Sequence, residues 1–447
     1  MIRRIKQTLG AAPLPTTRAA LAFVLLSGVP LLAPGRGAWI AAAVVVACCA
    51  AAAAFDARLL APRGAITVER TLPDKLSIGV PNPVVLALRN ASARPARVLV
   101  RETPPAGFAG ERLAGPVDVA AHGEAEVSLA FTPPSRGAFV FGDVGVRMLG
   151  PLGIVFRQEV VPCAQRCSVY PDITAVRGYA LLARRGKLHE IGIRAARLAG
   201  AGTEFESLRE YQPGDSFRDI DWKATARRGR PMVRQHEPER SQTLVIALDT
   251  GRLMAARTGT LTKLDRAVNA ALLLAYLGLE MGDHVGLLVF GRDVERFVSP
   301  RKGRRQFGVL LEALYDAQPR IEEPDYERAL RYLAQNLSRR SLVVLFTDVA
   351  GAEPSKRLLT VLSGLAPRHL ALVATQRNRA LEERAIADVT TVEDAFAAAV
   401  AEDLLRDKAE ALRMLASRGA LVLDVDPEDL SVAAVNRYLE VKARGQL

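Results

Sequence analysis

Two aspartates stand where short apolar runs end, and their carboxylates could bind a cation. Asp249 directly follows the run at 244–248, and Asp348 comes two residues after the run at 342–346. If these runs are neighbouring parallel strands, both side chains lie at the carboxyl end of a sheet, where such sheets bind ligands. Mg²⁺ prefers oxygen ligands, so both aspartates are candidate metal ligands. Auxiliary oxygens would come from Thr250, Thr347 and Asp325.

A second candidate site is a segment between 206 and 228 in which acidic and basic side chains alternate around a turn. The tripeptide Pro213-Gly214-Asp215 favours a tight turn because proline presets φ and glycine accepts positive φ. The aspartates of this segment lie among arginines, which lower carboxylate pKa values and favour salt bridges over acid–base catalysis. We expect an ordered charge network that fixes neighbouring domains or binds a partner. Its candidate residues are Glu206, Arg209, Glu210, Tyr211, Gly214, Asp215, Arg218, Asp221, Trp222, Lys223 and Arg227.

Sequence motifs that carry catalysis are absent. The sequence has no G-x4-G-K-[ST] phosphate loop, no H-E-x-x-H, no G-x-S-x-G elbow and no G-x-G-x-x-G after a strand. The five histidines are scattered without ligand spacing. Cys163 and Cys167 lack the second pair of a structural zinc site, and a disulfide is not expected in a reducing compartment. We therefore expect no enzymatic activity and no cofactor beyond weak Mg²⁺ binding.

The elements that would position the two aspartates begin at residue 243. Short runs rich in Val and Leu alternate with segments of helical period, which predicts an α/β domain with a mostly parallel sheet. The expected strands are at 244–248, 285–290, 342–346, 370–374 and 420–425. The expected helices are at 264–279, 306–315, 326–337, 355–365, 393–416 and 431–443.

Residues 64–172 have a different pattern, in which apolar and polar side chains alternate. That period is typical of strands with one buried face, and clusters of Pro, Gly and Asn separate the runs. We predict an all-β sandwich of the immunoglobulin-like type. The clearest expected strands are at 84–89, 96–101, 124–131 and 137–142.

Two apolar runs near the N-terminus, at 19–33 and 38–55, predict a membrane anchor. With flanking leucines each run approaches the ~20 residues that span a bilayer. Basic residues precede the first run and follow the second at Arg58, Arg63 and Arg70, so the positive-inside rule keeps both ends in the cytoplasm. A cleaved signal peptide is the alternative for the first run, but no small-x-small cleavage site follows it. We expect a two-helix hairpin in the inner (cytoplasmic) membrane, with the soluble domains in the cytoplasm.

The formal charge of +12 raises the question of a nucleic-acid partner. Aromatic residues make up only 5% of the chain and do not interleave with the basic clusters, so we expect no nucleic-acid binding. Membrane lipids are the nearer partner of the basic residues that flank the helices, and a solvated basic face is the alternative. A basic stretch at 184–202 is either a docking strip or a linker. We divide the chain into a basic N-terminal segment at 1–17, a transmembrane hairpin at 18–60, a β-sandwich at 64–172, a connector at 173–242 and an α/β domain at 243–447.

The strand-end acids resemble the metal site of a von Willebrand factor A domain. That site uses Asp-x-Ser-x-Ser after the first strand, a threonine from a later loop and an aspartate after the fourth strand. Here the serine positions are Gly251 and Leu253, and the threonine position is Pro324. Only Asp249 and Asp348 remain, so a divalent cation would bind weakly and keep most of its water. The alternative is that both aspartates cap helices or pair with nearby arginines such as Arg252.

The charged segment at 206–227 resembles the signature of bacterial membrane proteins in the family called domain of unknown function 58. Residues 134–147, followed by Gly-Pro-Leu-Gly-Ile-Val-Phe at 150–156, look like a second signature of that family. The resemblance implies a von Willebrand A-like (Rossmann-like) α/β domain behind a membrane anchor. It also implies a partner, a MoxR-type AAA+ ATPase, beside which such proteins are commonly encoded, and no agreed enzymatic activity.

Three hypotheses about function follow from these patterns. The first is a membrane-anchored, non-enzymatic protein-interaction module, an adaptor or chaperone partner of a MoxR-type ATPase. The second is a metal-dependent adhesion-type receptor that uses the degenerate site at Asp249 and Asp348. The third is a purely structural scaffold for envelope assembly, in which the charged segment only holds two domains together. We favour the first because the signature is intact and the catalytic motifs are missing.

Overall fold

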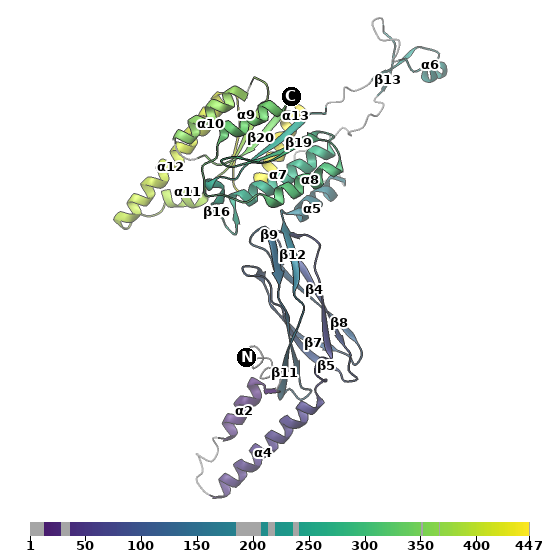
Figure 1. Ribbon diagram of the computed structural model, residues 1–447, viewed down its shortest axis with the longest axis vertical. Coiled ribbons are helices and arrows are strands. Elements are labelled where there is room, and N and C mark those ends of the chain that lie inside the picture. The colour runs from purple at the N-terminus through teal and green to yellow at the C-terminus, as the bar shows by residue number, and fades with distance from the viewer. Residues whose placement is uncertain are drawn as a thin grey trace. The chain divides into compact units, whose positions relative to one another are not determined.

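The computed structural model describes residues 13–27, 36–184, 207–212, 220–235, 241–349, 352–365 and 367–446 (Figure 1). The chain forms two compact units, Met1–Tyr170 and Pro171–Leu447. We call them the β-rich unit and the α/β unit. Residues 1–12 of the N-terminal basic segment, residues 28–35 between the two apolar helices and most of the basic stretch at 184–202 lie outside the described residues.

Three sheets make up most of the β-rich unit. One has the strand order β1-β11-β10-β5-β7, one has β2-β4-β8-β6, and the third has β3-β12-β9. Side chains alternate along β4, where Val84, Leu86 and Leu88 are buried, so the period-2 pattern of the sequence corresponds to one buried face. The strands are β1 (Leu14–Pro15), β2 (Ile66–Thr71), β3 (Leu76–Ser77), β4 (Asn82–Asn90), β5 (Ala96–Arg101), β6 (Ala109–Gly110), β7 (Leu113–Val119), β8 (Glu124–Thr132), β9 (Gly137–Phe141), β10 (Val144–Leu149), β11 (Val155–Val161) and β12 (Gln165–Tyr170).

Two helices precede these sheets, α2 (Thr17–Ser27) and α4 (Arg36–Leu59). Within the described residues one helical stretch, Trp39–Leu59, is long and apolar enough to cross a membrane. The described part of α2 has 11 residues, which is short of the ~20 needed to span a bilayer. The prediction of a membrane helix is therefore supported for α4, and the second span stays a prediction.

The end of α4 is fastened to the turn between β10 and β11. The Asp56 carboxylate is fully buried and accepts hydrogen bonds from the backbone N–H groups of Leu152 (2.8 Å), Ile154 (2.9 Å) and Val155 (3.0 Å). The carboxylate fills the space beside Gly150, where a Cβ atom would come within 2.3 Å of it. The Gly-Pro-Leu-Gly stretch of the second signature thus has a structural use, which is to hold the carboxylate at the end of the apolar helix.

Arginines complete this fastening at the carboxyl end of α4. Arg94 donates to the Leu60 carbonyl oxygen at 3.1 Å, and Arg157 donates to the Ala61 carbonyl oxygen. Cations are favourable at the end of a helix because its last carbonyl groups carry partial negative charge. Arg70, which the sequence grouped with the basic residues beside the membrane, is instead buried in an ion pair with Glu102 at 2.6 Å. Its guanidinium group is therefore not free to meet lipid head groups.

The α/β unit contains a six-stranded sheet with the order β19-β18-β15-β20-β21-β22. All neighbouring pairs are parallel except β18 and β19. The central strands are buried on both faces, which explains their continuous apolar runs. The strands are β15 (Thr243–Asp249), β18 (His284–Phe290), β19 (Val294–Arg301), β20 (Leu342–Phe346), β21 (Leu370–Gln376) and β22 (Leu421–Val425).

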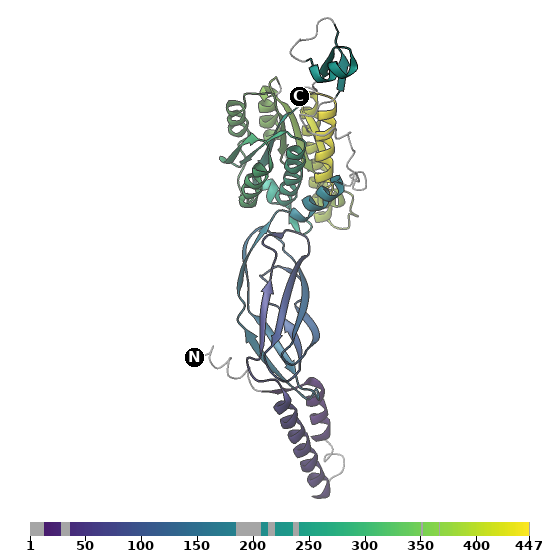
Figure 2. The ribbon, with the colours of Figure 1, turned by 90° about the vertical axis from the view of Figure 1, so that its right-hand side faces the viewer.

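Helices cover both faces of this sheet (Figure 1, Figure 2). On one face α9, α10 and the carboxyl half of α12 enclose a core that includes Phe290, Leu333, Leu358 and Leu415. On the other face α7 packs against α8 and α13. The helices are α5 (Ile173–Arg184), α7 (Lys263–Glu280), α8 (Arg304–Asp316), α9 (Tyr326–Asn336), α10 (Ala352–Leu365), α11 (Arg379–Ala385), α12 (Val392–Ser417) and α13 (Leu430–Ala443).

Candidate functional site

The two candidate metal ligands lie at the point where the strand order reverses. The chain runs from β15 to β18 on one side and later returns to β20 on the other side of β15. Crevices at such points, beyond the carboxyl ends of the strands, are where open α/β sheets usually bind ligands. Asp249 ends β15, and Asp348 follows β20 after Thr347. The structure thus brings together the two acids that the sequence singled out.

Asp249 is enclosed in a network of neutral donors. Its Oδ1 accepts from the Gly251 N–H at 2.7 Å, and its Oδ2 accepts from the Thr347 hydroxyl at 2.6 Å and from the Tyr326 hydroxyl at 3.3 Å. The residue is 1% exposed. Burial raises the pKa of this carboxyl to about 6, although the hydrogen bonds from Thr347, Gly251 and Tyr326 oppose the shift.

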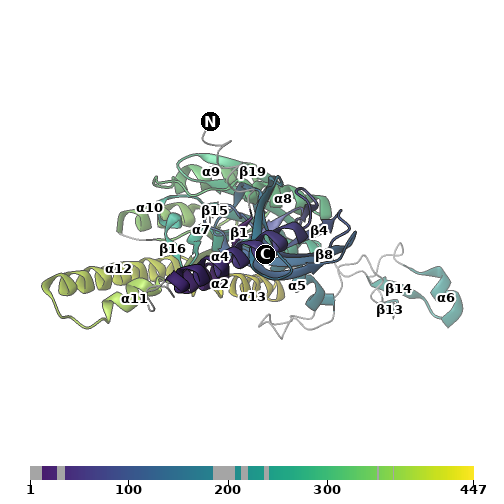
Figure 3. The same ribbon diagram turned by 90° about the horizontal axis from the view of Figure 1, so that it is seen from below.

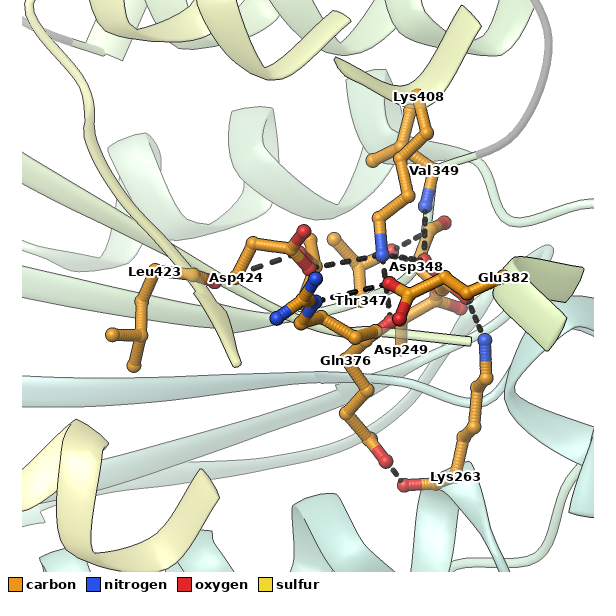
Figure 4. Close-up of polar contacts among 12 residues, drawn as sticks. Asp249, Lys263, Thr347, Asp348, Val349, Gln376, Glu382, Lys408, Leu423 and Asp424 are labelled. Carbon is orange, nitrogen blue, oxygen red and sulfur yellow. Dashed lines mark hydrogen bonds and ion pairs between the residues drawn. The ribbon is translucent and has the colours of Figure 1, made fainter. Parts of the chain in front are cut away.

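Asp348 has a different environment, because two lysines reach it from separate helices (Figure 4). Lys263, the first residue of α7, forms an ion pair with its Oδ2, and the Lys408 Nζ of α12 lies 3.5 Å from its Oδ1. Lys408 also pairs with Asp424 at 2.9 Å and donates to the Gln376 carbonyl oxygen at 2.6 Å. The side chains of Lys263 and Asp348 are only 4% and 9% exposed. A cationic group of the protein itself therefore occupies each side of this carboxylate.

These contacts do not fit a divalent cation. Among the described residues no group of three or more His, Cys, Asp or Glu side chains could hold a metal ion. A side chain at Gly251 would meet the ring of Pro324, whose Cδ would lie 2.7 Å from the new Cβ. The ammonium groups beside Asp348 would repel a cation.

The three auxiliary oxygens of the magnesium hypothesis are engaged elsewhere. The Thr250 hydroxyl donates to the Phe290 carbonyl oxygen at 3.0 Å, and its oxygen lies 2.8 Å from a Glu295 carboxylate oxygen. Asp325 caps α9 by accepting from a backbone N–H of that helix. The Thr347 hydroxyl donates a hydrogen bond to Asp249. The described oxygens therefore stabilise the fold around the strand ends.

Sequence reasoning missed the two lysines and Tyr326, which do most to define this cluster. One signal was available for Lys263. It directly follows Thr262, the N-cap residue of a capping box with Asp265, and so stands at the positive end of a helix. A positively charged side chain is unfavourable at the positive end of a helix. A lysine at this position therefore indicates an acidic partner from another part of the fold. No comparable signal marks Lys408, which lies inside a long helix.

The charged signature segment is described only in part. Glu206, Gly214, Asp215 and Arg218 lie outside the described residues. The described remainder forms a two-stranded sheet of β13 (Ser207–Glu210) and β14 (Met232–Gln235) with the short helix α6 (Trp222–Arg228) before β14. The backbone of Arg209 pairs with Val233 in this sheet. The roles of all these residues stay predictions.

Asp221 has a clear local role at the start of α6. Its carboxylate accepts from the N–H groups of Lys223 (3.0 Å) and Ala224 (2.9 Å), as an N-cap residue does. Glu210 pairs with Arg230 at 2.8 Å at an exposed position, and the Tyr211 N–H donates to a backbone carbonyl oxygen beside β14. These contacts order the described part of the segment locally, and the charge network stays a prediction.

Other signature side chains face solvent. Trp222 is 69% exposed, Lys223 and Arg227 are exposed, and α6 has no buried residue. Whether Trp222 fixes neighbouring domains or binds a partner stays a prediction.

Part of the chain is similar to known proteins. Residues 207–418 match the family described as "Protein of unknown function DUF58". An uncharacterized protein of Mycobacterium tuberculosis is 28% identical over 278 residues, which cover 59% of this chain and 86% of that protein. The uncharacterized protein YeaD of Bacillus subtilis is 29% identical over 136 residues, which cover 30% of this chain and 31% of that protein.

Solved structures give more distant likenesses. The CARDB domain of the PF1109 protein from Pyrococcus furiosus, in complex with di-metal ions, is 15% identical and covers 24% of this chain and 94% of its own, with a TM-score of 0.17. Proximal thread matrix protein 1 from the mussel byssus is 13% identical and covers 45% of this chain and 47% of its own, with a TM-score of 0.28. At these TM-scores neither structure decides the fold of this chain.

Proposed function

We propose that the chain is a membrane-anchored, non-enzymatic protein-interaction module, because residues 207–418 match the DUF58 family. Its partner in this proposal is a MoxR-type AAA+ ATPase, for which it acts as an adaptor or chaperone partner. The α/β unit has the von Willebrand A-like fold and the β-rich unit is an immunoglobulin-like sandwich. Helices α2 and α4 form a transmembrane hairpin in the inner membrane, with both units in the cytoplasm.

The observation that carries this proposal is the cluster of side chains at the strand ends, in which lysines of the protein neutralise the charge of Asp348. The position where an α/β sheet usually binds a ligand is filled by Lys263 and Lys408, and Asp348 is bound by both. Among the described residues, the donors to Asp249 are neutral groups. The cluster therefore holds the fold together, which favours a binding role for other surfaces over a catalytic or metal-dependent one.

The signature segment offers such a surface. Trp222 is exposed beside the exposed cations Lys223 and Arg227. Tryptophan and arginine are enriched among the residues that dominate the free energy of protein binding, because they bury a large area and donate several hydrogen bonds. The fixed cap at Asp221 presents them on an ordered helix, which lowers the entropy lost on binding. An acidic patch on the partner would complement this surface.

Copurification of the full-length chain from detergent-solubilised membranes tests the proposal. We expect the wild-type chain to retain a MoxR-type AAA+ ATPase, and Trp222→Ala with Arg227→Glu to reduce the retained ATPase at least tenfold. Arg339→Glu, a charge reversal at another exposed position of the α/β unit, serves as the matched control and should retain the wild-type amount. Equal retention by all three proteins would remove the signature segment from the interface, and no ATPase with the wild type would remove the proposed partner.

A further inference from the structure

Helices α11 (Arg379–Ala385) and α12 (Val392–Ser417) form a helical hairpin in the α/β unit. The carboxyl half of α12 packs on the sheet through Ala411 and Leu415, which are buried. The amino half extends beyond the helices that cover the sheet (Figure 1, Figure 3). A capping box between Thr391 and Asp394 fixes where this helix begins.

The amino half of α12 carries an apolar stripe that the described residues leave uncovered. Val392, Phe396 and Val400 are 79%, 74% and 49% exposed, and their spacing of four residues places them along one face. Ile386 and Val389, in the connection from α11, are also exposed. Single exposed apolar residues are ordinary, but a continuous patch on a monomer marks an interaction site. We call this patch the α12 stripe.

The charges around the α12 stripe are mostly negative. Between Ile386 and Leu405 the chain has no lysine and no arginine. The five carboxylates in this interval are Asp388, Glu393, Asp394, Glu402 and Asp403. Arg384 and Arg406 lie just outside it, where they pair with Asp394 and Asp403. The apolar surface is therefore bordered by net negative charge.

This charge decides between three kinds of occupant. An anionic lipid surface would bring negative head groups against negative side chains. A second copy of the chain placed on the same patch would oppose the same carboxylates to one another. A helix with an apolar face bordered by lysine or arginine would bury the apolar side chains of the stripe and pair with the carboxylates around it. Amphipathic helices dock in this way, through residues spaced three and four apart.

We propose that the α12 stripe, Ile386 to Leu404, docks a basic amphipathic helix of a protein partner. The stripe is separate in sequence from the signature segment at Trp222. The inference shares with the proposed function only the need for a protein partner, and it holds whether or not that partner is an ATPase.

Site-specific photo-crosslinking in the full-length, membrane-inserted chain tests this proposal. A benzophenone amino acid replaces Phe396 in one variant and Ile321 in a matched control, because Ile321 is also highly exposed, at 84%, but lies outside the stripe. We expect a crosslink from position 396 to a protein segment with apolar residues three or four apart and an excess of lysine and arginine. Position 321 should give no crosslink to that segment.

Charge reversal supplies the second arm. Glu402→Lys together with Asp403→Lys leaves the capping box intact and should lower the crosslink yield from position 396 at least fivefold. The proposal is overturned by a crosslink from position 396 only to lipid, to a second copy, to residues of the same chain or to an acidic segment, and by no crosslink at all. ATPase retention by the wild-type chain separates the two proposals, since a crosslink from position 396 to a basic amphipathic segment without a retained ATPase supports the α12 stripe and removes only the proposed ATPase partner.

Discussion

Replacing Lys263 with methionine tests whether the cationic group beside Asp348 holds the α/β unit together. Methionine keeps a similar length and apolar volume but removes the ammonium group. The pair is buried, with side chains 4% and 9% exposed. Removing one partner of a buried ion pair leaves the other charge without compensation and typically costs about 3–5 kcal/mol.

The arrangement of the cluster sets the expected loss at the lower end of that range. The Lys408 Nζ still lies 3.5 Å from the carboxylate and compensates part of its charge. We therefore expect Lys263→Met to lower the free energy of unfolding by about 3 kcal/mol. With about 2.1 cal/mol/K of unfolding entropy per residue, this loss lowers the Tm of a unit the size of Pro171–Leu447 by roughly 5 °C.

Thermal unfolding of the full-length chain in detergent measures this effect, and two variants interpret it. The exposed Lys302→Met is the matched control and should change Tm by about 1 °C or less. Lys263→Met combined with Asp348→Leu removes both charges and should lose less than the sum of the two single variants, because the charges are coupled. Millimolar MgCl2 should leave the Tm of the wild-type chain unchanged, since the ammonium groups repel the cation.

Three results would contradict a stabilising role for the Lys263–Asp348 ion pair or its competition with Mg²⁺. A loss below about 1 kcal/mol for Lys263→Met would mean that the ion pair is not a net contributor in the buried environment. Additive losses in the double variant would mean that the two side chains act independently. A rise in Tm with MgCl2 would show that a divalent cation competes successfully for the strand-end carboxylates, and would return the magnesium hypothesis to consideration.

Four further predictions concern other features. Asp56→Ala leaves three backbone N–H groups without an acceptor and should cost the β-rich unit about 3 kcal/mol or more in urea unfolding. Gly150→Ala should lower stability in the same assay by forcing a Cβ within 2.3 Å of that carboxylate, whereas Gly115→Ala, with nothing within 4 Å, should not. Trp222→Ala should change Tm by about 1 °C or less because the ring is 69% exposed, and a larger loss would support the scaffold hypothesis. Because the pKa of Asp249 is raised to about 6, its contribution to stability is fully present below pH ~4 and is lost as the pH rises through 6. Asp249→Asn should remove this loss of about 3 kcal/mol from unfolding curves measured between about pH 4 and 7, and an unchanged pH dependence would contradict the assignment.

The buried strands of the α/β unit were predictable because burial on both faces requires continuous apolar runs. The runs at 244–248 and 342–346 correspond to β15 and β20. Strand β19 was not predicted, because its side chains are half-exposed and Pro300 interrupts its pattern, as is common on an edge strand. Helix α11 was not predicted either, since its seven residues include none that is buried and so show no apolar period.

From the sequence, only the side chains at the strand ends could be placed together. Two acids at the ends of neighbouring parallel strands must lie close together, and Asp249 and Asp348 do. Their chemical partners come from helices whose positions depend on packing across the whole unit. Tyr326, Lys263 and Lys408 arrive from three different helices, and no local pattern states that they meet.

The two surfaces of α12 are connected through one residue. Lys408 lies between the exposed amino half of the helix and the carboxyl half that packs on the sheet. Its ammonium group bonds Asp424 and the Gln376 carbonyl oxygen and lies near Asp348, so the strand ends hold the helix at this point. The carboxyl half of α12 packs on the sheet, and this fixed point holds the exposed amino half in one orientation. A fixed orientation lowers the entropy lost when a partner docks. The acids that resemble a metal site therefore have a physical use without metal, which is to position the base of α12.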